Sequence, residues 1–118
     1  MKQKLRCMNR EEKKLLHDIF TSVENIEAYL GKERNFENYR KHKMLKHAVE
    51  RNIEIIGEAM GQLLRINPDI KITDGRKVSD TRNRIIHGYD SVDDATIWAI
   101  VINHLPVLKK EISALLGS

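Results

Sequence analysis

The sequence predicts an all-α fold, an antiparallel bundle of four main helices. Its 118 residues are 41% hydrophobic and 32% charged, with only six glycines and two prolines, which favours long amphipathic helices over a turn-rich β fold. Apolar residues also recur at intervals of three and four positions, the period of a helix with one buried face. The length suits one domain. We expect this domain over residues 9–118, with residues 1–8 as a disordered extension.

The first two helical patterns make up the first half of the chain. One helix is expected over residues 10–30, because Gly31 is a typical helix stop. Its apolar stripe consists of Leu15, Leu16, Ile19, Phe20, Val23, Ile26 and Leu30. A second pattern starts at Phe36 and closes before Pro68, with a break expected near residues 39–43. Within it, Gly57 and Gly61 lie one turn apart on the same face, at a cost in helix propensity. That cost predicts a closely packed neighbouring helix, from the same fold or from a partner chain.

Two further helices complete the predicted bundle. A short one is expected from residue 76 or 78 to residue 87, with Gly88 as its terminator. The last helix follows Ser91, which forms a capping-box-like start with Asp94 three positions later. Pro106 lies inside it and should kink the helix without ending it. Its expected apolar side consists of Val92, Ala95, Trp98 or Ala99, Ile102, Leu105, Leu108, Ile112, Leu115 and Leu116.

The basic residues are clustered along the chain. The net charge of +4 attracts polyanions without identifying one. Residues 39–47, YRKHKMLKH, hold four cations and no acid, whereas Asp90, Asp93 and Asp94 gather further on. The four cations are Arg40, Lys41, Lys43 and Lys46. A basic helical face of this kind is either simply solvated or binds phosphate.

Several classes of protein are not indicated by the sequence. It has no run of about eighteen apolar residues and no signal-peptide core, so we expect a cytoplasmic protein without a membrane span. The single Cys7 can form no internal disulfide, which suits a reducing compartment. The five histidines show no spacing typical of a zinc site, and we expect no metal or other cofactor.

The stretch RNRIIHGYD, residues 82–90, gathers the residues best suited to chemistry. Histidine exchanges protons near neutral pH, and arginine holds phosphate oxygens in a bidentate manner. Arg82 and His87 therefore suit cleavage of RNA, in which a 2′-hydroxyl loses a proton and the phosphate gains negative charge. Asn83 can orient the 2′-hydroxyl or the histidine, and this scheme requires no metal. The alternative is structural, with His87 at a helix end bonding the last carbonyls.

Arg82 and His87 cannot meet on one straight helix. Residues five positions apart are separated by about 140° around the helix axis. The two side chains converge only if His87 lies at a frayed helix end before Gly88, or if a second chain supplies the matching half.

The chain resembles the HEPN superfamily, specifically the HepT-like toxins that pair with MNT-type nucleotidyltransferase antitoxins. The likeness extends from about residue 8 to residue 116. It is most specific in the Arg-x4-His-x-Tyr signature, matched by Arg82, His87 and Tyr89, and in IIGEA at residues 55–59. It implies a homodimeric bundle of four or five helices per chain, whose two signatures share one basic cleft and cleave cellular RNA without a metal. Arg82 would stabilise the phosphate, His87 would act as acid or base, and Asn83 would be the polar residue that follows the arginine.

The resemblance also implies partners and regulation. Tyr89 would accept AMP from the nucleotidyltransferase, and the added phosphate would compete with RNA for Arg82. Alternatively, Tyr89 is an aromatic residue that caps the bundle. The basic residues 40, 41, 43 and 46 would extend the RNA path or face an acidic patch of the antitoxin. A different function remains open, that of a non-catalytic nucleotide-binding or scaffolding partner of a nucleotidyltransferase, although a scaffold has no chemical need for the Arg82 and His87 pair.

Overall fold

The computed structural model describes residues 8–73, 75–86 and 93–117, with the backbone alone for residues 81–86. Nearly all of these residues are helical, and no strand occurs among them, which confirms the all-α prediction. The elements are α1 (Arg10–Leu30), α2 (Phe36–Lys41), α3 (Lys43–Ile66), α4 (Gly75–Ile86), α5 (Asp94–Ala99), the π-helical turn η2 (Ile100–His104) and α6 (Leu105–Gly117).

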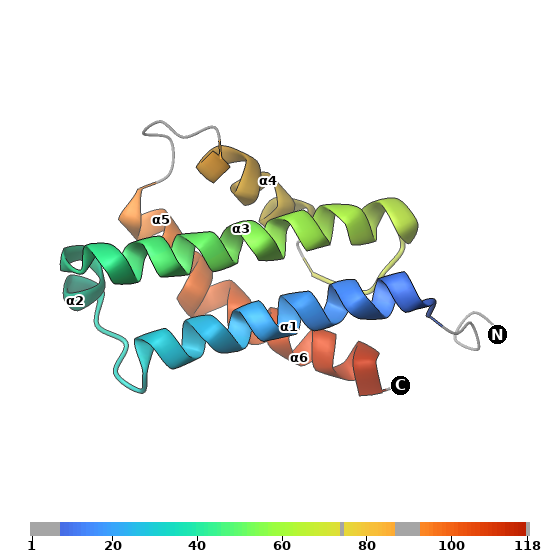
Figure 1. The fold of residues 1–118 in the computed structure, drawn as a ribbon, viewed down its shortest axis with the longest axis horizontal. Helices are drawn as coiled ribbons and strands as arrows, with labels where there is room; N and C mark the ends of the chain where they lie inside the picture. The colour runs from blue at the N-terminus through green and yellow to red at the C-terminus, as the bar shows by residue number, and fades with distance from the viewer. Residues whose placement is uncertain (1–7, 74, 87–92, 118) are drawn as a thin grey trace.

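The long helices α1 and α3 form the centre of the bundle. They run antiparallel and side by side, while α4 packs on α3 and α6 packs on α1 (Figure 1). The short α2 lies at the end of the bundle where α3 begins (Figure 1). Their buried side chains form one core together with those of the later helices. These side chains are Leu15, Leu16, Ile19, Val23, Ile26, Tyr39, Val49, Ile53, Ile56, Ala59, Met60, Leu63, Val78, Ile97, Val101, Leu105, Leu108 and Ile112.

Helix α1 has the predicted bounds and strong signals at both ends. The Asn9 side chain accepts a hydrogen bond from the Glu12 backbone N–H at 2.8 Å, and the Glu12 carboxylate accepts one from the Asn9 N–H at 3.1 Å. This reciprocal capping box satisfies two donors at the helix start. At the other end, Gly31 has a φ of 69°, a conformation that favours glycine.

The predicted break in the second pattern occurs at His42, which separates α2 from α3. His42 is the last cap of α2 and the first cap of α3, where its Nδ1 accepts a hydrogen bond from the Leu45 N–H at 3.1 Å. A single extended residue therefore turns the chain between two helices, and the basic residues 40–46 are divided between them.

The close helix contact predicted from the glycines is formed within the fold at Gly61. A Cβ atom on Gly61 would lie 3.1 Å from the Ser79 Oγ of α4, so the missing side chain lets α4 approach α3. At the start of α4, a Cβ on Gly75 would lie 3.2 Å from the Met60 sulfur. Gly57 is buried on the same face of α3. Helix α4 thus lies directly against the backbone of α3.

The last helix begins later than predicted. Asp93 caps α5, and its carboxylate accepts a hydrogen bond from the Thr96 N–H at 2.8 Å. The cap predicted at Ser91 is therefore wrong. Ser91 itself, together with Val92, lies outside the described residues. The sequence offers two acceptors close together, and the aspartate at the actual helix boundary takes the role.

The π-helical turn η2 precedes Pro106 and changes which residues face the core. The Leu105 N–H donates to the Ile100 carbonyl, five residues back, and the helix continues through the proline as predicted. Because a wide turn brings residues about four apart into line, Ile97, Val101 and Leu105 are buried. Ala95 and Ile102 are exposed, so their prediction as core residues was wrong. Of the two alternatives at positions 98 and 99, Trp98 packs against the core and Ala99 is exposed. No helix among the described residues is long and apolar enough to cross a membrane.

Candidate functional site

The Arg-x4-His-x-Tyr signature begins on α4. Arg82 and Asn83 lie on this helix, whose described part ends at Ile86, and only their backbone is described. His87, Gly88 and Tyr89 lie outside the described residues, so the predicted terminator at Gly88 and the two side-chain roles stay predictions. The contact of α4 with Gly61 places this helix on the face of α3 that also carries Gly57.

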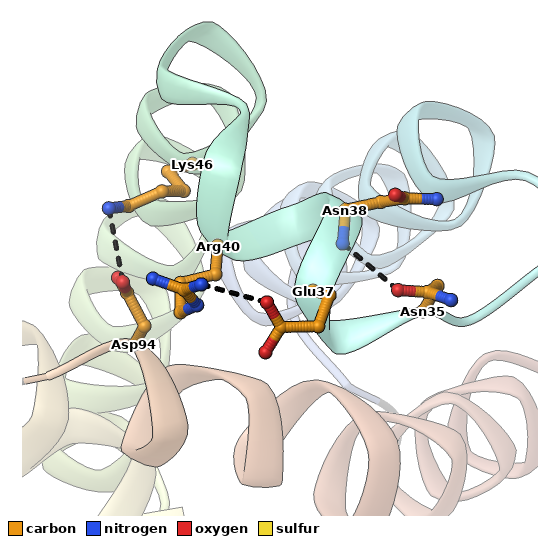
Figure 2. Close-up of polar contacts among 6 residues, drawn as sticks. All are labelled: Asn35, Glu37, Asn38, Arg40, Lys46 and Asp94. Carbon is orange, nitrogen blue, oxygen red and sulfur yellow. Dashed lines mark hydrogen bonds and ion pairs between the residues drawn. The ribbon is translucent and has the colours of Figure 1, made fainter.

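The four basic residues predicted to bind RNA lie around the junction of α2 and α3. Arg40 and Lys41 end α2, whereas Lys43 and Lys46 belong to the first turns of α3. Figure 2 shows two of them, together with Asn35, whose side chain caps α2 by accepting from the Asn38 N–H at 2.9 Å. The four cations therefore do not form one continuous helical stripe.

Arg40 is paired within its own helix. Its Nη2 lies 2.8 Å from the Glu37 Oε1, and both side chains are exposed (Figure 2). The hydrogen bond from Arg40 holds the pKa of the Glu37 carboxyl below its ordinary value of 4.5. Because water screens exposed ion pairs, Arg40 can exchange this partner at little cost.

Lys46 is paired with a residue far along the chain. Its Nζ lies 3.1 Å from the Oδ2 of Asp94, the first residue of α5, and the two side chains are 26% and 27% exposed (Figure 2). Among the described side chains, Lys41 and Lys43 have no carboxylate partner. The basic stretch lacks an acid in its own sequence, but Glu37 and Asp94 neutralise half of it in the fold.

Aromatic side chains pack beside this ion pair. Measured between ring centres, Tyr39 lies 5.2 Å and Phe36 lies 5.9 Å from Trp98. Tyr39 is buried, and its hydroxyl has no hydrogen-bond partner among the described residues. Burial raises the pKa of this hydroxyl, with further contributions from Glu50 and Asp94. Helix α5 is thus held on α2 by aromatic packing and on α3 by an ion pair.

Glu50 is a charged neighbour of this cluster that the sequence patterns did not single out. Burial raises the pKa of its carboxyl, and His47 and Lys46 oppose that increase. Its position one turn after Lys46 on α3 was the available signal, since residues four apart share a helix face.

The described residues offer no group of metal ligands near these charges. No group of three or more histidine, cysteine, aspartate or glutamate residues gathers among them. A shallow, mostly apolar hollow of about 290 Å³ lies over Phe36, Ala95, Trp98, Ala99, Ile102 and Asn103. This hollow does not offer the cationic lining that RNA phosphates require.

The sequence profile of the family described as Ribonuclease HepT-like matches residues 19–115. The chain belongs to the ribonuclease HepT-like family. This membership confirms the resemblance drawn from the Arg-x4-His-x-Tyr signature. The matched region extends from the middle of α1 into α6 and includes that signature. It also includes the basic junction, the region where α2 meets α3 and where Arg40, Lys41, Lys43 and Lys46 lie.

Similar proteins cover most of the chain. A protein of Thermococcus cleftensis named Probable ribonuclease HepT is 35% identical over 106 residues, or 86% of this chain and 93% of the relative. Two proteins of Methanocaldococcus jannaschii with provisional RNase names are 30% identical over 103 residues and 32% identical over 107 residues. The alignments cover 86% and 87% of this chain and 88% and 94% of those relatives. No solved structure is significantly similar to the chain.

Proposed function

We propose that this member of the ribonuclease HepT-like family is a metal-independent ribonuclease that uses Arg82, Asn83 and His87. The observation that carries the proposal is the family match over residues 19–115, which includes the whole signature. The ribonuclease names of relatives that align over most of the chain support the same activity.

The chemistry follows from the residue types. His87 would remove the proton of the 2′-hydroxyl or supply one to the leaving oxygen, because its pKa range allows both near neutral pH. Arg82 would bind the phosphate oxygens as negative charge builds up on them. Asn83 would orient the 2′-hydroxyl or the imidazole. In this scheme the residues themselves supply proton transfer and charge stabilisation.

A homodimer would complete the site. Helix α4 keeps its α-helical geometry from Arg82 through Ile86, which places positions five apart on different sides of the axis. Two copies of the signature facing one another would overcome this separation, because the arginine of one chain could act with the histidine of the other. Sedimentation of the purified chain should therefore show a dimer, and a protein that cleaves RNA as a monomer would contradict the shared site.

The basic junction would guide RNA to this site. Lys41 and Lys43 are exposed without a carboxylate partner among the described side chains, and Arg40 is in an exposed pair that phosphate can replace. The sequence predicts Lys46 in the same surface, but its pairing with Asp94 makes it a weaker ligand for phosphate, and we do not include it in the RNA path. An acidic patch on a protein partner would bind the same surface.

Two substitutions test the proposed activity. Arg82→Ala and His87→Ala should each lower RNA cleavage by about 100-fold or more in buffer containing EDTA, because proton transfer and phosphate stabilisation each contribute at least that much. Matched controls are Arg65→Ala and His17→Ala, which change exposed residues of the same types on α3 and α1. Equal cleavage by the signature variants and by the controls would refute the assignment.

The family resemblance leads to a regulatory proposal as well. We propose that a nucleotidyltransferase antitoxin neutralises the ribonuclease by transferring AMP to Tyr89, which would bring a competing phosphate close to Arg82. Intact-mass measurement after co-expression should detect one AMP on the wild-type chain and none on Tyr89→Phe. A stable complex with the transferase, without RNA cleavage by the isolated chain, would instead indicate a scaffolding subunit.

A further inference from the structure

Asp94 stands at a structurally important point of the chain. It is the first residue of α5 and follows His87 by seven positions. Its carboxylate reaches back to Lys46 on α3, across 48 positions of sequence, with an Nζ to Oδ2 distance of 3.1 Å (Figure 2). The pair therefore joins the helix that follows the signature to the central helix of the bundle.

The chain that precedes the signature is held by the same central helix. Helix α4 packs on α3 through Gly61 and Ser79, and Val78 of α4 is buried in the core. The chain thus leaves α3 through α4 and returns to α3 at Asp94. The Lys46 to Asp94 contact sets the distance between α3 and the residue at which α5 starts.

We propose that Lys46 and Asp94 form a positioning pair, which fixes the start of α5, the helix that follows the signature, on α3 and so supports RNA cleavage. This inference rests on the proposed ribonuclease function. Lys46 then acts through Asp94 on the placement of α5 and does not bind RNA phosphate itself.

The environment of Lys46 supports this role over an RNA contact. A phosphate that approached Lys46 would have to displace Asp94 and would meet the negative charge of that carboxylate. Lys41 and Lys43 offer exposed cations close by, without that repulsion. Both partners of the pair are about three-quarters buried, which also lessens its screening by water and salt.

A double-substitution cycle tests the pair. Lys46→Met and Asp94→Asn should each lower kcat by about 10- to 100-fold, the effect of displacing a catalytic group by about an ångström. KM and its dependence on salt should stay close to wild type. The double variant should be no slower than the slower single variant, because both changes remove the same contact.

A second ion pair provides the matched control. Lys109 of α6 lies 2.8 Å from Glu27 of α1, with 33% and 37% exposed side chains, and it also joins two helices. Lys109→Met and Glu27→Gln should keep the wild-type kcat. A general loss of helix packing would lower kcat in both sets of variants, whereas loss of the positioning pair lowers it only in the Lys46 and Asp94 variants.

Two outcomes would overturn the inference while the wild type still cleaves RNA. In the first, Asp94→Asn keeps kcat and binds RNA more tightly, which would show that Lys46 is released to contact phosphate. In the second, the effects of the two single substitutions multiply in the double variant. Failure of the wild type to cleave RNA would instead reject the proposed function.

Hydrogen exchange tests the anchoring independently of activity. Backbone amides of residues 94–99 should exchange faster in Lys46→Met and in Asp94→Asn than in the wild type, because local opening of α5 becomes easier. The Lys109 and Glu27 variants should show wild-type exchange in the same residues. Unchanged exchange in all four variants would overturn the inference, whether or not the protein cleaves RNA.

Discussion

The contact of α1 with α3 differs in kind from the contacts that α4 and α5 make with α3. The first contact belongs to the apolar core, in which Leu16, Ile19 and Ile56 are fully buried. A polar pair also joins the two helices, since Asn25 donates to the buried Asn52 and Asn52 donates to the Ala48 carbonyl. On the other side of α3, Gly61 admits α4, and Lys46 binds Asp94 of α5.

The contact of α1 with α3 mainly supplies stability, whereas the other two contacts mainly set the positions of α4 and α5. Burial of apolar area is the main favourable term in folding, so the α1 and α3 pair should account for most of the free energy of unfolding. A glycine contact and an ion pair contribute less energy, but they depend strongly on distance and direction. In the sequence, the signature begins on α4 and ends before α5, the two helices whose positions on α3 are set by these contacts.

The largest effect is expected in the apolar contact. Ile56→Ala should lower the free energy of unfolding by about 2–5 kcal/mol, because the residue is fully buried and would leave a cavity. Val78→Ala in α4 removes a smaller side chain at the edge of the core and should cost about 1–2 kcal/mol. Urea unfolding curves measure both values. Equal losses of unfolding free energy in the two variants would contradict the difference between the α1 contact and the α4 contact.

Substitution of Gly61 should cost less stability than Ile56→Ala but should displace α4. Gly61→Val should lower the free energy of unfolding by about 1–3 kcal/mol, because its side chain would press against the Ser79 Oγ and push α4 outward. RNA cleavage should fall further than this loss of stability alone explains, since α4 carries Arg82. Gly117→Val is the control, because a Cβ there meets nothing within 4 Å. Wild-type cleavage by folded Gly61→Val would show that the spacing of α3 and α4 does not matter for activity.

The smallest effect is expected from the carboxyl of Glu50, whose pKa burial raises above the ordinary value of 4.5. The folded protein holds this proton more tightly than the unfolded chain, so the associated stability is complete below pH 4.5 and is lost as the pH rises through the raised pKa. Glu50→Gln should therefore stabilise the fold slightly at neutral pH and should have no effect at about pH 4.

Urea unfolding at the two pH values measures this effect. Glu33→Gln, in the exposed connection between α1 and α2, is the control and should change stability at neither pH. Lower stability of Glu50→Gln at neutral pH would mean that attraction to Lys46 and His47 outweighs the cost of burial.

The sequence predicted the parts of the fold whose signals are local. The bounds of α1 could be found because an apolar stripe ends at a glycine, and the break at His42 because charged residues interrupt the second pattern. Gly61 was predictive because its cost in helix propensity has few explanations other than close packing. Each of these signals involves residues within a few positions of one another.

The missed features depend on contacts between distant residues or on unusual helix geometry. The ion pair of Lys46 could not be read from residues 39–47, because its partner is at position 94. The buried face before Pro106 was predicted incorrectly because the sequence does not show directly that a turn is π-helical. The roles of Arg82, His87 and Tyr89 came from a known signature, and they remain to be tested by the variants above.

The π-helical turn η2 gives the chain room for variation in length. It contains one residue more than an α-helical turn would need, and it takes up that residue between two regular helices. A chain shorter by one residue between Ile100 and His104 could close this turn into a continuous α-helix, with Asp94 and Trp98 still facing Lys46 and Tyr39. Deletion of one residue at this point should then be tolerated, whereas the same change between Ser79 and Asp94 would alter the site itself.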